Sequence, residues 1–190
     1  QYGTPLIVST GRLVYYKGFE HLIAASRELD ASVVIIGSGP LESRLRFLSR
    51  DLPHVHLLGQ VPEDRLLALL AAADCFVLAS TSHAEGFGIA TLEAQALGVP
   101  AVVTDVGTAT VEAIHPDVSG LVISPGSTAE LVAACKALLE QDGTRAAMRT
   151  AAREHVQRHH SSAALGERLR QIYEAAAGGA SVESTAVTRV

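Results

Sequence analysis

Short apolar runs alternate with longer amphipathic stretches along most of this 190-residue chain. The apolar runs are nearly continuous, which is typical of strands buried on both faces of a parallel sheet. We predict strands at residues 6–8, 33–36, 55–58, 76–78, 101–103 and 121–123. The stretches between and after them predict helices at residues 19–29, 40–50, 63–72, 89–97, 127–140, 144–159 and 163–177. Because strand–helix alternation builds right-handed βαβ units, the predicted fold class is α/β, a doubly wound, Rossmann-like parallel sheet of six strands.

This alternation predicts one Rossmann-like domain at residues 1–177, followed by a small, polar tail or linker at residues 178–190. The chain begins Gln1-Tyr2-Gly3 and enters a strand almost at once. We interpret it as a piece of a longer protein.

Composition narrows the classes of partner. The net charge is −5 without a basic block, and aromatic residues make up 4% with no Trp, which argues against a nucleic-acid partner. Cys75 and Cys135 are expected to be buried free thiols. His54 and His56 lack a third ligand at metal spacing, and the pair at 159–160 is expected to be solvated at a helix end. No apolar run is long enough to span a bilayer.

Glycine-containing loops follow nearly every predicted strand, at residues 9–12, 37–40, 59–62, 79–88 and 104–108. In a parallel sheet these loops lie at the carboxyl edge, where ligands bind. Glycine lets a backbone approach a ligand closely. Ordinary turn chemistry explains any one of these loops, but five along one edge indicate a binding site.

Two carboxylates in the run from 85 to 93 flank a Gly-Phe-Gly break. Gly86 and Gly88 place Glu85 in a loop, and Glu93 lies about one turn into the next helix. Both carboxylates then lie near a helix N-terminus, which favours an anion. A site that combines carboxylates with an anion hole suits a ligand with hydroxyls and phosphates, such as a nucleotide sugar.

Two cations, Arg12 and Lys17, follow the first strand and match the two negative charges of a diphosphate. Glu93 then suits a ribose diol and Glu85 the hydroxyls of the transferred sugar. The backbone N–H groups of Phe87, Gly88 and Ile89 would face the distal phosphate. Solvated surface charges are the simpler reading of each residue alone. A general acid/base pair for glycoside hydrolysis is a further alternative, but it leaves both cations unused.

With these motifs in place, the chain resembles the C-terminal, donor-binding domain of a retaining GT-B glycosyltransferase of the group 1 family, which includes sucrose synthase, glycogen synthases and bacterial mannosyltransferases. The resemblance covers roughly residues 6–173, with every motif in order. The motifs on which the resemblance rests are Gly11-Arg12 with Lys17-Gly18, the turn at 37–40, Ala73-Asp74, the stretch 85–93, the run 97–102 and the final strand and turn at 120–126.

The resemblance implies that Arg12, Lys17 and Glu85 act in catalysis. Donor contacts would come from Gly11, Gly37, Val61, Gly86, Phe87, Gly88, Ile89 and Glu93, with Val61 meeting the base edge through its backbone. It implies a hexosyltransferase with no metal and no cofactor, whose donor is a GDP- or UDP-linked sugar, in polysaccharide or glycolipid synthesis. It also implies a cytoplasmic location, at the inner face of the membrane where the missing half associates with it.

One departure concerns the stretch after the fifth strand, where the family often has Gly-Gly and this chain has only Gly107. That departure, with the segment 13–18, is more similar to bacterial polysaccharide and O-antigen mannosyltransferases. The N-terminal acceptor domain is absent from this chain, so we expect it to transfer no sugar alone. A non-catalytic nucleotide- or sugar-binding module and a nucleotide-sugar epimerase stay open as alternatives.

Overall fold

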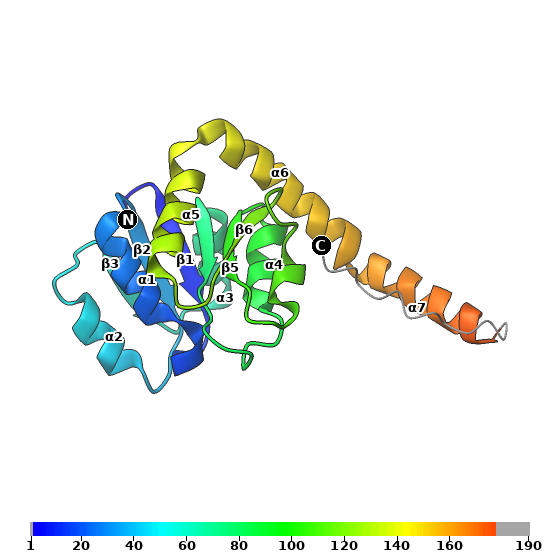
Figure 1. Cartoon of the computed structure of the whole chain (residues 1–190), viewed down its shortest axis with the longest axis horizontal. Coiled ribbons are helices and arrows are strands. Elements are labelled where there is room, and N and C mark those ends of the chain that lie inside the picture. The colour runs from blue at the N-terminus through cyan, green and yellow to red at the C-terminus, as the bar shows by residue number, and fades with distance from the viewer. Residues whose placement is uncertain (1, 178–190) are drawn as a thin grey trace.

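The computed structural model describes residues 2–177 and contains a six-stranded sheet in which all neighbouring strands are parallel (Figure 1). The order across the sheet is β3-β2-β1-β4-β5-β6. The predicted doubly wound sheet is therefore confirmed, and each predicted strand is present. The strands are β1 (Leu6–Thr10), β2 (Ser32–Ile36), β3 (Val55–Gly59), β4 (Cys75–Leu78), β5 (Ala101–Thr104) and β6 (Gly120–Ile123).

The α-helices follow the predicted pattern closely. They are α1 (Phe19–Ala25), α2 (Glu42–Ser49), α3 (Glu63–Ala71), α4 (Ile89–Ala96), α5 (Thr128–Glu140), α6 (Asp142–His159) and α7 (Ser162–Ala177). The single helix predicted at 19–29 is wrong in its second half. The Ser26 hydroxyl donates to the Ile23 carbonyl at 2.8 Å, and the chain tightens there into a 3-10 helix, η2 (Ser26–Glu28). Two further 3-10 helices, η1 (Tyr15–Lys17) and η3 (Ala109–Ala113), were not predicted.

Both faces of the sheet are buried, which explains the continuous apolar runs. Successive residues of a strand point to opposite faces, so Ile7 joins one core and Val8 the other. The first core packs under α1, α2 and α5, and the second packs under α3 and α4. Full burial of one such side chain stabilises the fold by about 1.5–3 kcal/mol. Cys75 and Cys135 both lie in the first core as buried thiols, as predicted.

Helix α6 is anchored across the ends of its neighbours by arginines. Arg145 donates to the Leu139 carbonyl at 2.8 Å, at the end of α5. Arg149 and Arg153 donate to the carbonyls of Ala73, just after α3, and of Leu97, the C-cap of α4, both at 3.0 Å. Because cations stabilise helix C-termini, these contacts fix α6 against three helices at once.

Helix α7 extends away from the sheet and the helices that cover it (Figure 1). It buries no residue, and its apolar side chains lie at spacings that share one helix face. They are Leu165, Leu169, Ile172 and Tyr173, which are 57%, 44%, 51% and 72% exposed. None of the helices in residues 2–177 combines the length and the apolarity needed to cross a membrane. The predicted tail at 178–190 lies outside the described residues.

Candidate functional site

The order of the strands reverses between β1 and β4, which are neighbours at the centre of the sheet. In doubly wound sheets, ligands bind outside the carboxyl ends of the strands at this reversal. Backbone hydrogen bonds join the loops that leave these strands. Leu13 N–H donates to the Ser38 carbonyl at 2.9 Å, and Thr81 N–H donates to the Tyr16 carbonyl at 2.7 Å. The loops after β1, β2 and β4 therefore form one connected surface.

A glycine lets the loops after β1 and β2 touch. Gly37 has φ of 140°, and a Cβ built on it would lie 1.9 Å from the Gly11 carbonyl oxygen. Only glycine fits this contact, because any side chain would collide with backbone. The two predicted donor-contact glycines are thus brought into direct contact.

A cavity of about 720 Å³ opens between the loops after β1, β2 and β3. Four predicted site residues line it, namely Gly11, Arg12, Gly37 and Val61. Its other lining residues were not predicted to contact a ligand, and they are Thr10, Ile36, Ser38, Gly39, Pro40, Gln60 and Leu66. Arg12 is exposed and makes no ion pair within residues 2–177, so its guanidinium is available to an anion in this cavity.

Lys17 and Glu85 form an ion pair, with Nζ 2.6 Å from Oε2. Their side chains are only 13% and 9% exposed. The approach depends on Gly18, at φ of 68°, because a Cβ there would lie 1.8 Å from the Ala79 carbonyl oxygen. The loop after β1 therefore packs directly onto the end of β4, which carries the lysine to the glutamate. The sequence suggested a role for each residue but not their pairing.

Further contacts fix the Glu85 segment. The Ser80 hydroxyl donates to Glu85 Oε2 at 2.9 Å, so this one oxygen accepts from both a cation and a hydroxyl. The Thr108 hydroxyl donates to the Glu85 carbonyl at 2.7 Å and ties the segment to the loop after β5. Sequence reasoning missed Ser80 and Thr108. The available signal was that each follows a buried strand at the carboxyl edge.

The first turn of α4 lies just after this segment, as predicted. Gly88 is the N-cap, and no side chain of the described residues caps the helix. The helix therefore presents free backbone N–H groups, which suit an anion. Glu93 is exposed on α4, one turn in, and the Ile89 side chain at the helix start is 69% exposed.

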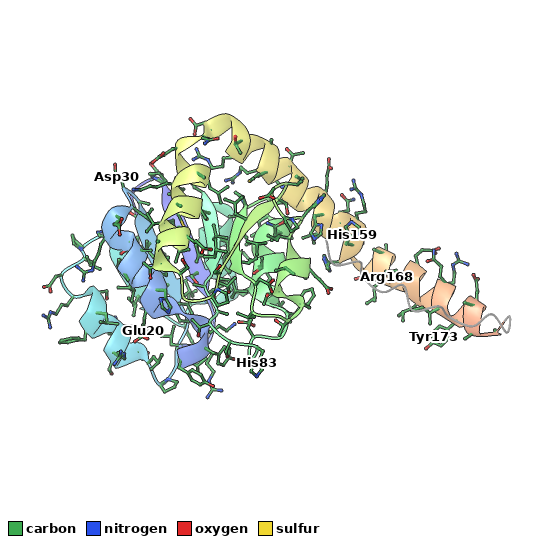
Figure 2. All side chains as sticks on the ribbon, viewed as in Figure 1. Glu20, Asp30, His83, His159, Arg168 and Tyr173 are labelled. Carbon is green, nitrogen blue, oxygen red and sulfur yellow. The ribbon has the colours of Figure 1, made fainter. Side chains whose placement is uncertain are left out.

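The predicted residues thus fall into two groups on one edge. Arg12 lines the cavity with the glycines and Val61, whereas Lys17, Glu85 and the start of α4 do not line it. His83 is exposed in the loop that joins β4 to α4 (Figure 2). Within residues 2–177, no group of three or more His, Cys, Asp or Glu side chains is placed to hold a metal ion.

Residues 2–155 match the family model described as glycosyl transferases group 1. One curated relative is the GDP-mannose-dependent monoacylated alpha-(1-6)-phosphatidylinositol monomannoside mannosyltransferase of Corynebacterium glutamicum. It is 37% identical over 182 residues, which are 90% of this chain and 47% of that protein. The chain therefore spans about half the length of the curated relatives it matches.

Two solved structures have the same fold. Sucrose-phosphate synthase from Thermosynechococcus elongatus matches with a TM-score of 0.80 at 24% identity, over 92% of this chain and 46% of that chain. The C-terminal domain of a glycosyl transferase group 1 family protein from Francisella tularensis matches with a TM-score of 0.73 at 23% identity, over 85% of this chain and 88% of that one. The arrangement of strands and helices seen here is thus the fold of these two structures.

Proposed function

The chain belongs to the group 1 family of glycosyl transferases, as its ordered motifs predicted, and we propose that it binds the nucleotide-diphosphate-sugar donor for retaining hexosyl transfer. The acceptor would be held by an N-terminal domain outside this chain. The observation that carries the proposal is the placement of Arg12, the Lys17–Glu85 pair and the uncapped N-terminus of α4 along one edge of the sheet.

Three sources of positive charge support the diphosphate site. Arg12 offers a planar fork of donors above the cavity, and Lys17 offers a compact charge beside it. The first turn of α4 adds backbone N–H groups and the positive end of the helix dipole. A diphosphate that bridges these groups needs no metal ion to balance its charge.

The carboxylates support the division of hydroxyl contacts. Glu93 is exposed at the start of α4, where its two oxygens can accept from both hydroxyls of a ribose. Glu85 is buried against Lys17 and Ser80, and its remaining acceptor sites suit the hydroxyls of the transferred sugar. Retention and catalytic roles for Arg12, Lys17 and Glu85 are part of the same proposal.

GDP-mannose is our first candidate for the donor, because the curated relative is a GDP-mannose-dependent mannosyltransferase. The cavity of about 720 Å³ lies within the roughly 300–1,000 Å³ of ordinary small-ligand sites. Val61 lines this cavity, so its backbone is available to the edge of the base. A UDP-linked hexose is the alternative donor, and a non-catalytic nucleotide-binding module is the alternative role.

The exposed face of α7 supports a partner domain. Leu165, Leu169 and Ile172 present apolar surface to solvent, and the chain spans about half of its relatives. We infer that this face packs against the N-terminal acceptor domain of the same protein. Cytoplasmic location, next to a membrane that supplies the acceptor, belongs to this proposal.

Calorimetric titration with GDP, GDP-mannose, UDP and UDP-glucose tests donor binding. We expect either the two guanosine compounds or the two uridine compounds to bind. Arg12→Ala should weaken binding by about tenfold to a hundredfold, because it removes hydrogen bonds between a charged side chain and the diphosphate. Glu93→Ala should weaken binding as well. Arg27, also exposed but in η2 at the opposite edge, is the matched control, and Arg27→Ala should bind normally. No nucleotide binding, or normal binding by Arg12→Ala, refutes the proposal.

We also infer that the chain alone transfers no sugar, because residues 2–177 form only the one sheet domain to which we assign the donor. Incubation with GDP-mannose labelled in its mannose, and with a bacterial membrane lipid extract as acceptor, tests this inference. Labelled lipid formed by the chain alone would contradict it.

A further inference from the structure

Four histidines gather at the end of α6, and we call His115, His155, His159 and His160 the histidine cluster. The His155 ring lies 5.1 Å from that of His159, 5.2 Å from that of His160 and 6.3 Å from that of His115, measured between centroids. Figure 2 shows His159 at the end of α6 that joins α7. His159 is exposed as predicted, whereas His160, the C-cap of α6, is only partly exposed. Its ring is held by contacts on two sides.

On one side, the cluster is bound to a single carbonyl. His155 Nε2 and His160 Nε2 each lie 3.1 Å from the carbonyl oxygen of Glu112, in η3. A carbonyl oxygen only accepts, so both nitrogens must carry hydrogen. In the neutral rings, Nε2 therefore carries the hydrogen and Nδ1 is unprotonated.

On the other side, His160 meets the donor loop. Its ring lies 5.7 Å from that of Phe87, at an interplanar angle of 70°, which is an edge contact that aromatic rings favour. Phe87 stands between Gly86 and Gly88, directly before α4. A Cβ on Gly86 would meet no atom within 4 Å, so packing around that glycine does little to fix the loop.

Helix η3 connects the two sides. The Ala109 N–H donates to the Gly86 carbonyl at 3.2 Å, and the Thr108 hydroxyl donates to the Glu85 carbonyl at 2.7 Å. The far end of η3 is held by the two histidines on Glu112. Because Arg153 fixes α6 to the C-cap of α4, the position of His160 relative to α4 is also set.

We propose that His160 is a positioning residue for the donor-binding loop, holding Phe87 and η3 in place. It touches no reacting atom, and it acts through Phe87 on the segment 85–89. The inference rests on the proposed function, because it assigns the loop to the donor. The loop can nevertheless be monitored without any ligand.

Acid should loosen the cluster that holds this contact. The groups facing His155 and His160 are His159 from α6, His115 from the segment after η3, the Glu112 carbonyl and the uncharged Phe87. No carboxylate forms an ion pair with these rings within residues 2–177. Burial lowers the pKa of His155, and charge on the neighbouring rings lowers it further, against the opposing effect of the Glu112 carbonyl. Because burial disfavours the charged ring of His155, acid should loosen the cluster and the loop that it holds.

Binding of GDP-mannose at about pH 7.5 and about pH 5.5, on either side of the ordinary histidine pKa, tests this. A nucleotide sugar is the right probe because each of its phosphates carries one ester and one anhydride bond, which leaves no proton that titrates in this range. The full chain should bind more weakly in acid. His160→Ala should weaken binding about threefold to tenfold at the higher pH, the worth of one hydrogen bond, and should lose most of the pH response.

Two further variants separate the contacts of His160. His160→Gln keeps a donor for the Glu112 carbonyl but has no ring between His155 and Phe87, so affinity should be restored only in part while the pH response stays flat. His54→Gln is the matched control, since His54 Nε2 also contacts a carbonyl at 3.1 Å, that of Ser26, far from the loop. It should retain both affinity and pH response. Affinity and pH response in His160→Ala equal to those of the unmodified chain would overturn the proposal.

A ligand-free measurement distinguishes this inference from the proposed function. The chain has no Trp, so Phe87→Trp introduces a single reporter at the loop. Its emission should change on acidification, and the change should vanish when His160→Gln is added. If no nucleotide sugar binds the unmodified chain, the proposed function fails while this titration still decides the positioning role. An emission change that is the same with and without His160→Gln overturns the positioning role.

Discussion

Breaking the Lys17–Glu85 ion pair should cost far more stability than breaking a surface pair of similar length. The Nζ–Oε2 distance is 2.6 Å and the side chains are 13% and 9% exposed. The matched pair is Arg46–Glu42 on α2, at 2.8 Å, with side chains 52% and 35% exposed. The two pairs therefore differ in access to water and in the Ser80 hydroxyl that also donates to Glu85.

The expected magnitude follows from burial. Removing one partner of a buried pair leaves the other charge uncompensated and typically costs about 3–5 kcal/mol. Slight exposure of Lys17 favours the lower end, so Glu85→Ala and Lys17→Ala should each lower the free energy of unfolding by about 3 kcal/mol. In a domain of this size that corresponds to a melting temperature lower by about 6–12 °C. The double variant should lose much less than the sum, because neither charge is left alone.

A double-mutant cycle measured by urea unfolding isolates the coupling. We expect about 2–3 kcal/mol for Lys17 with Glu85, and about 0.3–0.5 kcal/mol for Arg46 with Glu42. Added salt should reduce the second coupling more than the first, because buried charges are screened less. A coupling for the buried pair no larger than that of the surface pair would refute the reasoning from burial.

Backbone geometry, histidine protonation and thiol burial each give a further prediction. Gly37→Ala places a Cβ 1.9 Å from a backbone oxygen and should lower the free energy of unfolding by about 2 kcal/mol or more. Gly166→Ala, in open space within α7, should instead raise the free energy of unfolding by about 0.5–1 kcal/mol. Urea unfolding of the two variants compares these effects. Burial lowers the pKa of His155, so the contribution of the neutral ring to the free energy of unfolding is complete above about pH 6.5 and is lost as the pH falls. The free energy of unfolding of His155→Gln should therefore depend less on pH, which urea unfolding at several pH values checks. A hydrogen bond with Cys135, and then burial, raise the pKa of the Cys75 thiol. Because both thiols are buried, they should react with a thiol reagent only when the protein unfolds. Rapid reaction of either thiol in the folded protein would contradict this.

The fold was predictable from the sequence because burial on both faces leaves a direct signal. Strands such as β2 read as continuous Val and Ile runs, and the helices between them have the length that a crossover needs. The loops at the carboxyl edge of the sheet could be identified as well, because each of them directly follows a strand. Arg12, Gly37 and Val61 therefore line one cavity although they come from three different loops.

Contacts that depend on the order of strands were not predictable. Lys17 and Glu85 are 68 residues apart, and they meet because β1 and β4 are neighbours at the reversal of the sheet. No local pattern records that adjacency. The contact of His160 with Phe87 depends on the path of α6 past α4, which three arginine–carbonyl contacts fix. Short 3-10 segments such as η3 also lack a periodic signal of their own.

The Lys17–Glu85 pair gives the proposed donor site an order of events. In the free chain Glu85 neutralises Lys17, whereas Arg12 and the first turn of α4 have no anionic partner within residues 2–177. In the proposed site, an arriving diphosphate would meet Arg12 and the helix first, and would compete with Glu85 for Lys17 afterwards. Each contact that Lys17 gave to phosphate would free Glu85 to accept from a sugar hydroxyl. A diphosphate without a sugar leaves that carboxylate buried with fewer partners, so the pair itself favours the complete donor over the bare nucleotide.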